Sequence, residues 1–173
     1  MQTIITAIFL LLFSQSARAE LVQIRLIDNL DEPRGYCIDI RGHKEQAKLD
    51  KGLQVHTCYS YQGLLGVDQA FEKILIRSGK FYLPYFNVCM EAEELMKGAR
   101  LVLRKCNSNI MQNFEYTLNK QIKHAGEHNL CITVSKGKSR KGGGGSPTHL
   151  IRFLKIDDCL EGEYQHSTWE IIN

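Results

Sequence analysis

The sequence predicts an all-β fold made of three copies of one unit, and three cysteine pairs with three aromatic tags carry this prediction. The tags lie 43 and 55 residues apart, counted from one aromatic residue to the next. A period in this range indicates one structural unit copied three times. The tags that follow the pairs are Gln69-Ala70-Phe71-Glu72, Gln112-Asn113-Phe114-Glu115 and Ser167-Thr168-Trp169-Glu170.

Twelve short runs rich in β-branched and aromatic residues predict four strands in each copy. No copy can bury its apolar face alone, so the three must share one core. We expect Phe71, Phe114 and Trp169 to fill it, and only 91–97 to form a helical turn. The predicted strands are 22–28, 36–40, 53–58, 70–75, 80–86, 88–92, 100–106, 113–117, 121–125, 130–134, 150–156 and 168–172.

The first nineteen residues have the pattern of a secretory signal peptide. An apolar run from Ile4 to Phe13 precedes the small-x-small motif Ala17-Arg18-Ala19. The run is too short to span a membrane. We therefore expect cleavage before Glu20, one domain over residues 20–173, and a secreted or periplasmic protein.

Charge gives no reason to expect nucleic acid or a membrane surface as the partner. Without Arg18 the chain has 21 Lys and Arg residues against 19 Asp and Glu residues, a net charge of +2. So small an excess does not produce the basic field that such partners require. No cofactor is indicated.

Secretion makes disulfides the natural use of six cysteines. Six cysteines allow 15 pairings, so the count alone does not determine the connectivity. One bridge inside each copy preserves the repeat, and no C-x-x-C or paired-histidine spacing indicates a metal site. The predicted bridges are Cys37–Cys58, Cys89–Cys106 and Cys131–Cys159.

A basic glycine-rich segment, residues 136–147, breaks the symmetry in the third copy. It carries four positive charges from Lys136 to Lys141 and the glycine run Gly142 to Gly145. Such a composition predicts an exposed, mobile loop whose deletion would leave the melting temperature nearly unchanged. It is either a contact for anionic groups or a solvated insertion.

Taken together, these motifs resemble the ricin B-type lectins. The pattern is a cysteine in C-φ-D-φ, a second cysteine, and then Q-x-[WF], three times over. The resemblance covers roughly residues 21–172 and implies a β-trefoil with one potential sugar pocket in each repeat. It also implies a glycan ligand, galactose-like by family.

In the first copy, the resemblance implies a set of sugar-binding positions that departs from the family at the amide and has a smaller stacking ring. Asp39 matches the aspartate that accepts hydrogen bonds from sugar hydroxyls. Gln54 and His56 take the positions of the polar residue and the stacking ring. The family's Asn-Gln pair corresponds to Asp68-Gln69, with Asp68 in place of the asparagine. A carboxylate, amides and a flat ring are also what sugar recognition requires chemically.

The other two copies depart from the pattern. The second has Glu91 for the aspartate, and Val102 and Arg104 for the polar residue and the ring. The third has Thr133, then Lys155 and Asp157. At most one pocket is therefore expected, in the first copy.

Two function classes remain open. The first is a monovalent carbohydrate-binding protein. The second is an interaction subunit, such as a toxin component or inhibitor, that binds a protein partner with a degenerate lectin fold. Catalysis is not indicated, because the chain lacks H-E-x-x-H and G-x-S-x-G motifs and its cysteines are assigned to bridges.

Overall fold

The computed structural model describes residues 19–63, 65–160 and 163–173, and this part of the chain is mainly β structure. The predicted signal peptide lies outside the described residues except for Ala19. The strands are β1 (Leu21–Leu26), β2 (Tyr36–Ile40), β3 (Leu53–Thr57), β4 (Phe71–Glu72), β5 (Tyr82–Leu83), β6 (Val88–Ala92), β7 (Leu101–Arg104), β8 (Phe114–Tyr116), β9 (Ile122–His124), β10 (Glu127–Val134), β11 (Arg140–Lys141), β12 (Leu150–Asp158) and β13 (Trp169–Ile172). The helices are α1 (Lys73–Arg77) and α2 (Tyr164–Ser167), and 3-10 turns cover Lys44–Gln46, Leu49–Lys51, Tyr59–Gln62, Val67–Gln69 and Ile110–Gln112.

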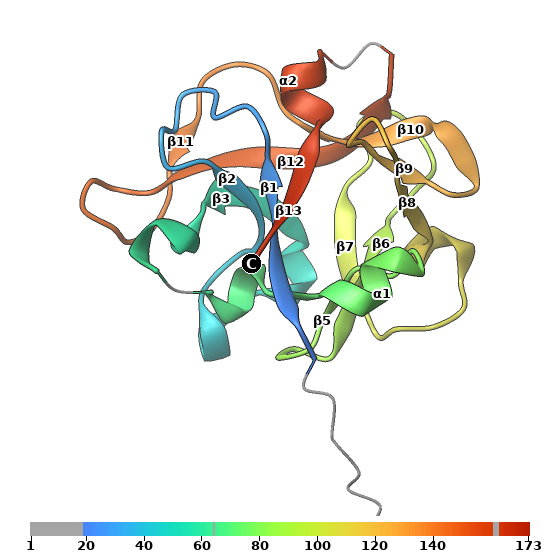
Figure 1. The fold of residues 1–173 in the computed structure, drawn as a ribbon, viewed down its shortest axis with the longest axis horizontal. Helices are drawn as coiled ribbons and strands as arrows, with labels where there is room; N and C mark the ends of the chain where they lie inside the picture. The colour runs from blue at the N-terminus through green and yellow to red at the C-terminus, as the bar shows by residue number, and fades with distance from the viewer. Residues whose placement is uncertain (1–18, 64, 161–162) are drawn as a thin grey trace, which may run out of the picture.

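The strand pairing repeats three times. Each copy contributes one long antiparallel pair, β2 with β3, β6 with β7, and β10 with β12. The first strand also pairs with the last one, with Leu26 opposite Trp169 (Figure 1). The chain therefore closes on itself with pseudo-threefold symmetry, which is the predicted β-trefoil.

The core contains side chains from all three copies, as the repeat requires. Phe71 and Trp169 are 0% exposed and Phe114 is 2% exposed, so the prediction for the tag aromatics is confirmed. The ring of Phe81 lies between Phe71 and Phe114, edge to face, with centroid distances of 6.4 and 5.8 Å. Such pairs stabilise the core beyond the area they bury.

The three predicted disulfides are confirmed: Cys37–Cys58, Cys89–Cys106 and Cys131–Cys159. Each joins the two long strands of one copy or their immediate flank. The bridges close loops of 21, 17 and 28 residues. Loops of this size stabilise the fold by about 3 kcal/mol each in the chain-entropy model.

Two local predictions were wrong. The strand expected over 70–75 ends at Glu72, and α1 follows. A strand would place Ile74 and Ile76 on one face, whereas the helix exposes Ile74 (59%) and buries Ile76 (3%). The helical turn expected over 91–97 is absent, because β6 continues to Ala92 in register with β7.

Candidate functional site

The candidate site lies on one face of the strands β2, β3, β12 and β11. His56 on β3 lies opposite Ile151 on β12, and Ile151 lies opposite Arg140 on β11. Asp39 on β2 lies opposite Gln54, two residues from His56 on β3. Because side chains alternate along a strand, these residues project from the same face.

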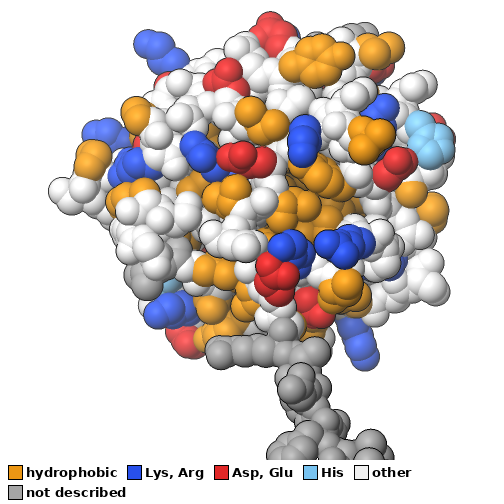
Figure 2. Space-filling model, viewed as in Figure 1, with side chains coloured by type: hydrophobic (Ala, Val, Ile, Leu, Met, Phe, Trp, Pro, Cys, Tyr) orange, Lys and Arg blue, Asp and Glu red, His pale blue; other side chains and the backbone are white. Residues whose placement is uncertain are grey.

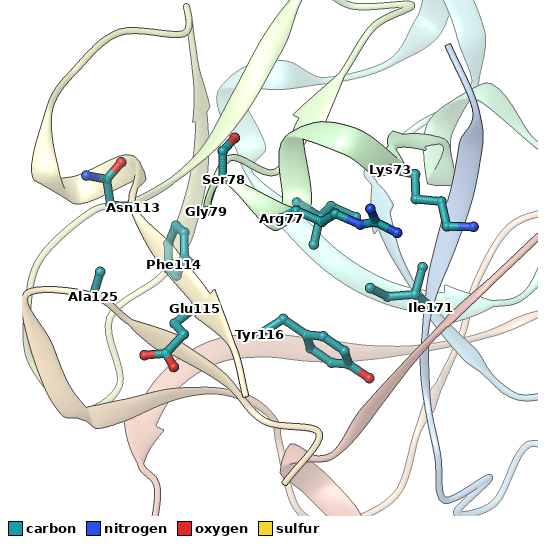
Figure 3. Close-up of a pocket in the computed structure, with 11 residues that line it drawn as sticks. Lys73, Arg77, Ser78, Gly79, Asn113, Phe114, Glu115, Tyr116, Ala125 and Ile171 are labelled. Atoms are coloured by element: carbon teal, nitrogen blue, oxygen red, sulfur yellow. The ribbon is translucent and has the colours of Figure 1, made fainter. Parts of the chain in front are cut away.

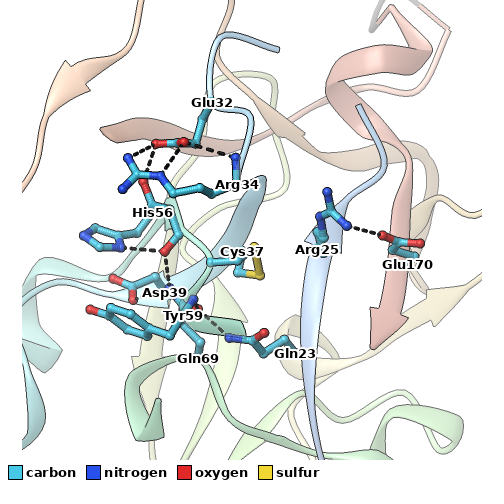
Figure 4. Close-up of a disulfide and its surroundings, with 12 residues drawn as sticks. Gln23, Arg25, Glu32, Arg34, Cys37, Asp39, His56, Tyr59, Gln69 and Glu170 are labelled. Carbon is cyan, nitrogen blue, oxygen red and sulfur yellow. Dashed lines mark hydrogen bonds and ion pairs between the residues drawn. A yellow bond between two sulfur atoms is a disulfide. The ribbon is translucent and has the colours of Figure 1, made fainter. Parts of the chain in front are cut away.

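Gln69 is fully occupied in bracing the first copy. Its Nε2 donates to Oδ2 of Asp39 and to the carbonyl of Thr57, both at 3.1 Å. Its Oε1 accepts from Nε2 of Gln23 at 2.7 Å and from the amide of Tyr59 at 3.0 Å. Figure 4 shows this cluster beside the disulfide of Cys37. Gln69 therefore orients its neighbours rather than a ligand.

Gln112 makes three of the four corresponding bonds in the second copy. Its Nε2 donates to Oε2 of Glu91 at 2.8 Å and to the carbonyl of Lys105 at 3.1 Å. Its Oε1 accepts from the amide of Asn107 at 2.9 Å. In the third copy the position is Ser167, whose buried hydroxyl has no partner among the described residues. The tag glutamine is thus a structural brace in two copies.

Asp39 lies beneath the site and is only 1% exposed. Besides Gln69, it accepts a hydrogen bond from Nε2 of Gln54 at 3.2 Å on Oδ1. Burial raises the pKa of its carboxyl well above the ordinary value, and the nearby Asp68 adds to the rise, while the amide donors oppose it. Asp39 thus holds Gln54 in position from below.

Asp68 is fully buried and fixes the loop that borders the site. Its Oδ2 lies 2.8 Å from Nδ1 of His43, and its Oδ1 accepts from the amide of Lys44 at 2.8 Å. The carboxylate that replaces the family's amide therefore positions an exposed imidazole at the rim.

A cavity of about 480 Å³ opens above these residues. Of the five positions predicted for sugar binding, Gln54 and His56 line this cavity, whereas Asp39, Asp68 and Gln69 lie behind its wall. Both the first and the third copy contribute to it. The lining residues are Gly42, His43, Gln46, Gln54, His56, Tyr59, Gly142, Gly143, Gly144, His149 and Ile151.

Three rings form one wall of the cavity. His56 contacts His149 edge to face at a centroid distance of 4.9 Å, and it contacts Tyr59 at 5.4 Å. Nδ1 of His56 donates to the carbonyl of Thr57 at 2.9 Å, which orients the ring. Burial lowers the pKa of both imidazoles, so near neutral pH the wall is uncharged and suited to the apolar face of a ligand.

Polar atoms without a partner surround this wall. Nδ1 of His149 is buried and has no hydrogen-bond partner within the described ranges, while its Nε2 lies 2.8 Å from the hydroxyl of Tyr61. Within the same ranges, the hydroxyl of Tyr59 and Oε1 of Gln54 make no hydrogen bond either. Buried polar groups in native proteins nearly always find a partner. Nδ1 of His149 is such a buried atom, and the hydroxyl of Tyr59 and Oε1 of Gln54 are two further polar groups that a ligand can bind.

Sequence reasoning missed Tyr59 and His149. Tyr59 directly follows Cys58, so its place beside the site could have been inferred from the cysteine position. No local signal marks His149, because it reaches the site only through the pairing of β12 with β3.

The basic segment of the third copy is exposed as expected, but it is attached to the body rather than detached. Oδ2 of Asp31 accepts from the amide of Ser139 at 3.1 Å and from its hydroxyl at 2.8 Å. β11 pairs with β12, and Arg34 donates to the carbonyls of Pro147 and Thr148 at 2.8 and 3.1 Å. The segment is therefore hydrogen-bonded to the body near both of its ends, and the prediction that its deletion leaves the melting temperature nearly unchanged stays a prediction.

The glycines of this segment permit a close approach to the histidine wall. A Cβ at Gly145, where φ is +77°, would lie 2.3 Å from Cδ2 of His149. A Cβ at Gly142 would lie 2.9 Å from Ile151 and 3.3 Å from Nε2 of His56. The glycine run thus has a packing role in addition to its flexibility.

In the second and third copies, the residues at the sugar-binding positions are buried or bonded to other residues of the same copy. In the second copy Glu91 binds Gln112, and Val102 is 4% exposed. In the third, the hydroxyl of Thr133 donates to the carbonyl of Cys131 at 3.3 Å, and Lys155 pairs with Asp157 at 2.5 Å.

A second, larger cavity of about 730 Å³ lies between α1, β8 and the end of β13. Figure 2 shows a hollow with an apolar floor flanked by basic side chains, and Figure 3 shows Arg77, Tyr116 and Ile171 around it. Arg77 has no ion-pair partner among the residues that the structure places. None of the predicted sugar-binding positions lines this cavity.

Two features are absent from the part of the chain that the structure describes. No helix is long and apolar enough to cross a membrane. No group of three or more His, Cys, Asp or Glu side chains is arranged to hold a metal ion.

Comparison with known structures confirms the fold. The β-trefoil lectin of the Vibrio vulnificus hemolysin/cytolysin, solved with N-acetyl-D-lactosamine bound, has a TM-score of 0.56 and 16% identity over 91% of this chain and 96% of that one. The designed threefold-symmetric protein ThreeFoil has a TM-score of 0.61 and 14% identity over 88% and 98%. The agglutinin from Abrus precatorius has a TM-score of 0.55 and 13% identity over 90% of this chain, which spans only 47% of the agglutinin. Identities this low establish the architecture alone.

A comparison with curated protein sequences finds no match. The family model of the ricin-type beta-trefoil lectin domain, however, matches residues 26–150, which is more than half of the chain. The chain therefore belongs to the ricin-type β-trefoil lectin family.

Proposed function

We propose that this protein is a carbohydrate-binding lectin with one sugar pocket, the ring-lined cavity of the first repeat. The observation that carries the proposal is the wall of three uncharged rings beside polar atoms that have no partner within the described structure. A sugar presents an apolar face and a rim of hydroxyls, and this cavity offers a surface for each. The related fold from Vibrio vulnificus was solved with N-acetyl-D-lactosamine, which supports a glycan as the ligand class.

The residues divide into two roles. Tyr59 and His56 supply ring contact, and Tyr59, Gln54 and His149 supply hydrogen bonds to hydroxyls. Asp39, Asp68 and Gln69 act through these residues: Asp39 holds Gln54, Asp68 holds His43, and Gln69 holds the backbone at Tyr59. A single pocket is favoured because Glu91 and Thr133 are engaged within their own copies.

A glycan-array screen of the disulfide-bonded protein, followed by calorimetric titration of the best glycan, tests this proposal. Tyr59→Ala should weaken binding at least about tenfold, since an aromatic contact and a hydrogen bond together contribute about 1.5 kcal/mol or more. Thr133→Ala, at a pocket position of the third copy, is the matched control and should bind like the parent. Equal losses in both variants, or no glycan bound by the parent, would contradict the proposal.

A second candidate function, binding of a protein partner, is favoured by the cavity beside α1. The cavity combines an apolar floor with the unpaired Arg77, and the exposed Ile74 lies outside it on the same helix, α1. Ile74→Ser would weaken such a complex and leave glycan binding unchanged. The two functions are therefore separable by variants at the two cavities.

We propose in addition that the protein is secreted, because the expected signal peptide directly precedes the described fold. Disulfides in all three copies agree with an oxidising compartment. Sequencing of the purified protein's N-terminus should begin at Glu20. A start at Met1 would contradict cleavage.

A further inference from the structure

One guanidinium at the edge of the ring-lined cavity lacks any counter-charge. Arg41 follows β2 directly, and the next residue, Gly42, lines the cavity. Nε of Arg41 is buried and has no hydrogen-bond partner among the described residues. No described carboxylate forms an ion pair with this side chain. Arg41 as a whole is only partly buried, so its guanidinium presents an unpaired charge that a ligand can reach.

The neighbours of Arg41 are positive as well. Burial lowers the pKa of Arg41, and the charges of Arg140 and Arg100 lower it further. Arg100 is neutralised by two hydrogen bonds to Glu93, at 2.8 and 2.6 Å. Arg140 has no ion pair with any described residue. Arg41 and Arg140 are thus two cations without a carboxylate partner among the described residues, close enough for the charge of Arg140 to act on Arg41.

Sheet register connects this pair with the cavity. Arg140 lies directly opposite Ile151, which lines the cavity, and Ile151 lies opposite His56. Phe153 follows on the same face, since it is two residues along β12, and Arg100 bridges to Lys155 two residues further on. His56, Ile151, Phe153 and Arg140 thus project from one face of the sheet, and Arg41 enters the cavity border through its neighbour Gly42.

We propose that the pocket takes an acidic sugar, a saccharide carrying a sulfate ester or a carboxylate, whose anionic group lies against Arg41 and Arg140. This inference rests on the proposed sugar-binding function and names its ligand class. The planar guanidinium fork binds carboxylate and sulfate oxygens in a bidentate manner, which a lysine cannot do. The insertion of the third repeat supplies both Arg140 and the glycine wall, so it converts the first-repeat pocket into a site for acidic ligands.

Two of the three other cations of the insertion, Lys136 and Lys141, do not share this arrangement. Lys141 is adjacent to Arg140 in β11 but projects from the opposite face, because it lies opposite Leu150. Lys136 pairs with Glu163 at 3.2 Å. Selection of an anion therefore depends on the two arginines rather than on the overall charge of the segment, and Lys141 provides a matched control.

The test compares three probes by calorimetry with the disulfide-bonded protein: lactose, lactose 3′-sulfate and 3′-sialyllactose. We expect one acidic probe to bind about tenfold more tightly than lactose, and its identity shows whether the group is a sulfate or a carboxylate. This preference should decrease as the NaCl concentration rises, because part of the contact is exposed. Arg41→Gln and Arg140→Gln should each bring the ratio of acidic-probe affinity to lactose affinity close to one, while the affinity for lactose itself stays unchanged. Lys141→Gln should keep the ratio of the parent.

Three results would overturn the inference. If lactose and both acidic probes bind equally well, the pocket is a neutral site and only the proposed function remains. The same holds if Lys141→Gln reduces the preference as much as the arginine variants do, since general charge then explains it. If Arg41→Gln and Arg140→Gln weaken all three probes equally, the arginines are structural. If the parent binds none of these three probes, this inference fails as well, whereas the proposed function fails only if the glycan array also shows no binding.

Discussion

Asp31 is the main anchor of the third-repeat insertion, and its removal is the sharpest test of how that segment serves the pocket. Its Oδ1 accepts from the hydroxyl of Tyr36 at 2.8 Å and from Nη2 and Nε of Arg152 at 2.8 and 3.1 Å. Its Oδ2 accepts both bonds from Ser139. Asp31→Ala therefore leaves a nearly buried guanidinium without its carboxylate and releases the start of β11.

The expected cost follows from the exposure of the two partners. The side chain of Arg152 is 6% exposed and that of Asp31 is 39% exposed. Breaking a fully buried pair costs about 3–5 kcal/mol, and the exposure of the carboxylate reduces this to about 2 kcal/mol. For a domain of this size, the melting temperature should fall by roughly 4–8 °C.

Differential scanning calorimetry of Asp31→Ala, Ser139→Ala and Asp50→Ala measures this effect. Ser139→Ala removes one anchoring bond and should cost about 1 kcal/mol or less. Asp50 is an exposed carboxylate paired with Lys51, so Asp50→Ala is the surface control and should change the melting temperature little. Asp31→Ala should also weaken glycan binding, although Asp31 does not line the cavity.

The pH dependence provides a second check. Burial opposes ionisation of Asp31, but its hydrogen bonds, chiefly from Arg152, outweigh burial and hold its pKa below the ordinary value of 3.8. Because the pKa of Asp31 is lower in the folded state than in the unfolded state, its ionised carboxylate stabilises the folded protein above pH 3.8. This stabilisation is lost as the pH falls toward the pKa of the folded state. The gap between parent and Asp31→Ala should therefore be largest near neutral pH. A gap as small as that of Asp50→Ala at pH 7 would refute the anchoring role.

Three further predictions follow from the site. Asp39 has a raised pKa, so the stability that it contributes is present below pH 3.8 and is lost as the pH rises through the raised value. Asp39→Asn should therefore gain melting temperature relative to the parent between pH 4 and pH 7, and a constant difference would contradict the pKa direction. Gly145→Ala should displace His149 and weaken glycan binding, whereas Gly137→Ala, with φ of +90° and open space around its Cβ, should not; titration calorimetry compares them. Gln69→Ala should lower the free energy of unfolding by about 2 kcal/mol, because it leaves buried partners unpaired, and the melting temperature should fall with it. An unchanged thermal transition would refute the bracing role.

The repeat architecture could be predicted from the sequence because its signals are local and occur three times. The aromatic tags at Phe71, Phe114 and Trp169 and the cysteine pairs each mark one copy. Because the tags and the cysteine pairs indicate the same unit three times, the three copies are expected to share one core that buries all three aromatic residues. The strand predicted over 70–75 depended on the composition of that one segment. There the packing of Ile76 into the core decided the structure, and α1 forms instead.

The candidate site was predicted only in part. Gln54 and His56 line the cavity as the family pattern implied, since strand alternation and the position of Cys58 determine where they project. Asp39, Asp68 and Gln69 occupy the predicted region, yet their burial and hydrogen bonds could not be inferred from their chemical type. Whether a carboxylate faces a ligand or braces a neighbour depends on what covers it.

The sequence by itself determined the fold, the disulfides and the region of the pocket, because these depend on spacing within a copy. Only the tertiary structure decided what the pocket contains. His149, Arg140 and the glycine wall reach the first repeat through pairing of β12 with β3 and β11, across about ninety positions of the chain. Contacts between residues so far apart leave no local pattern in the sequence, since their placement depends on the closure of the whole β-trefoil.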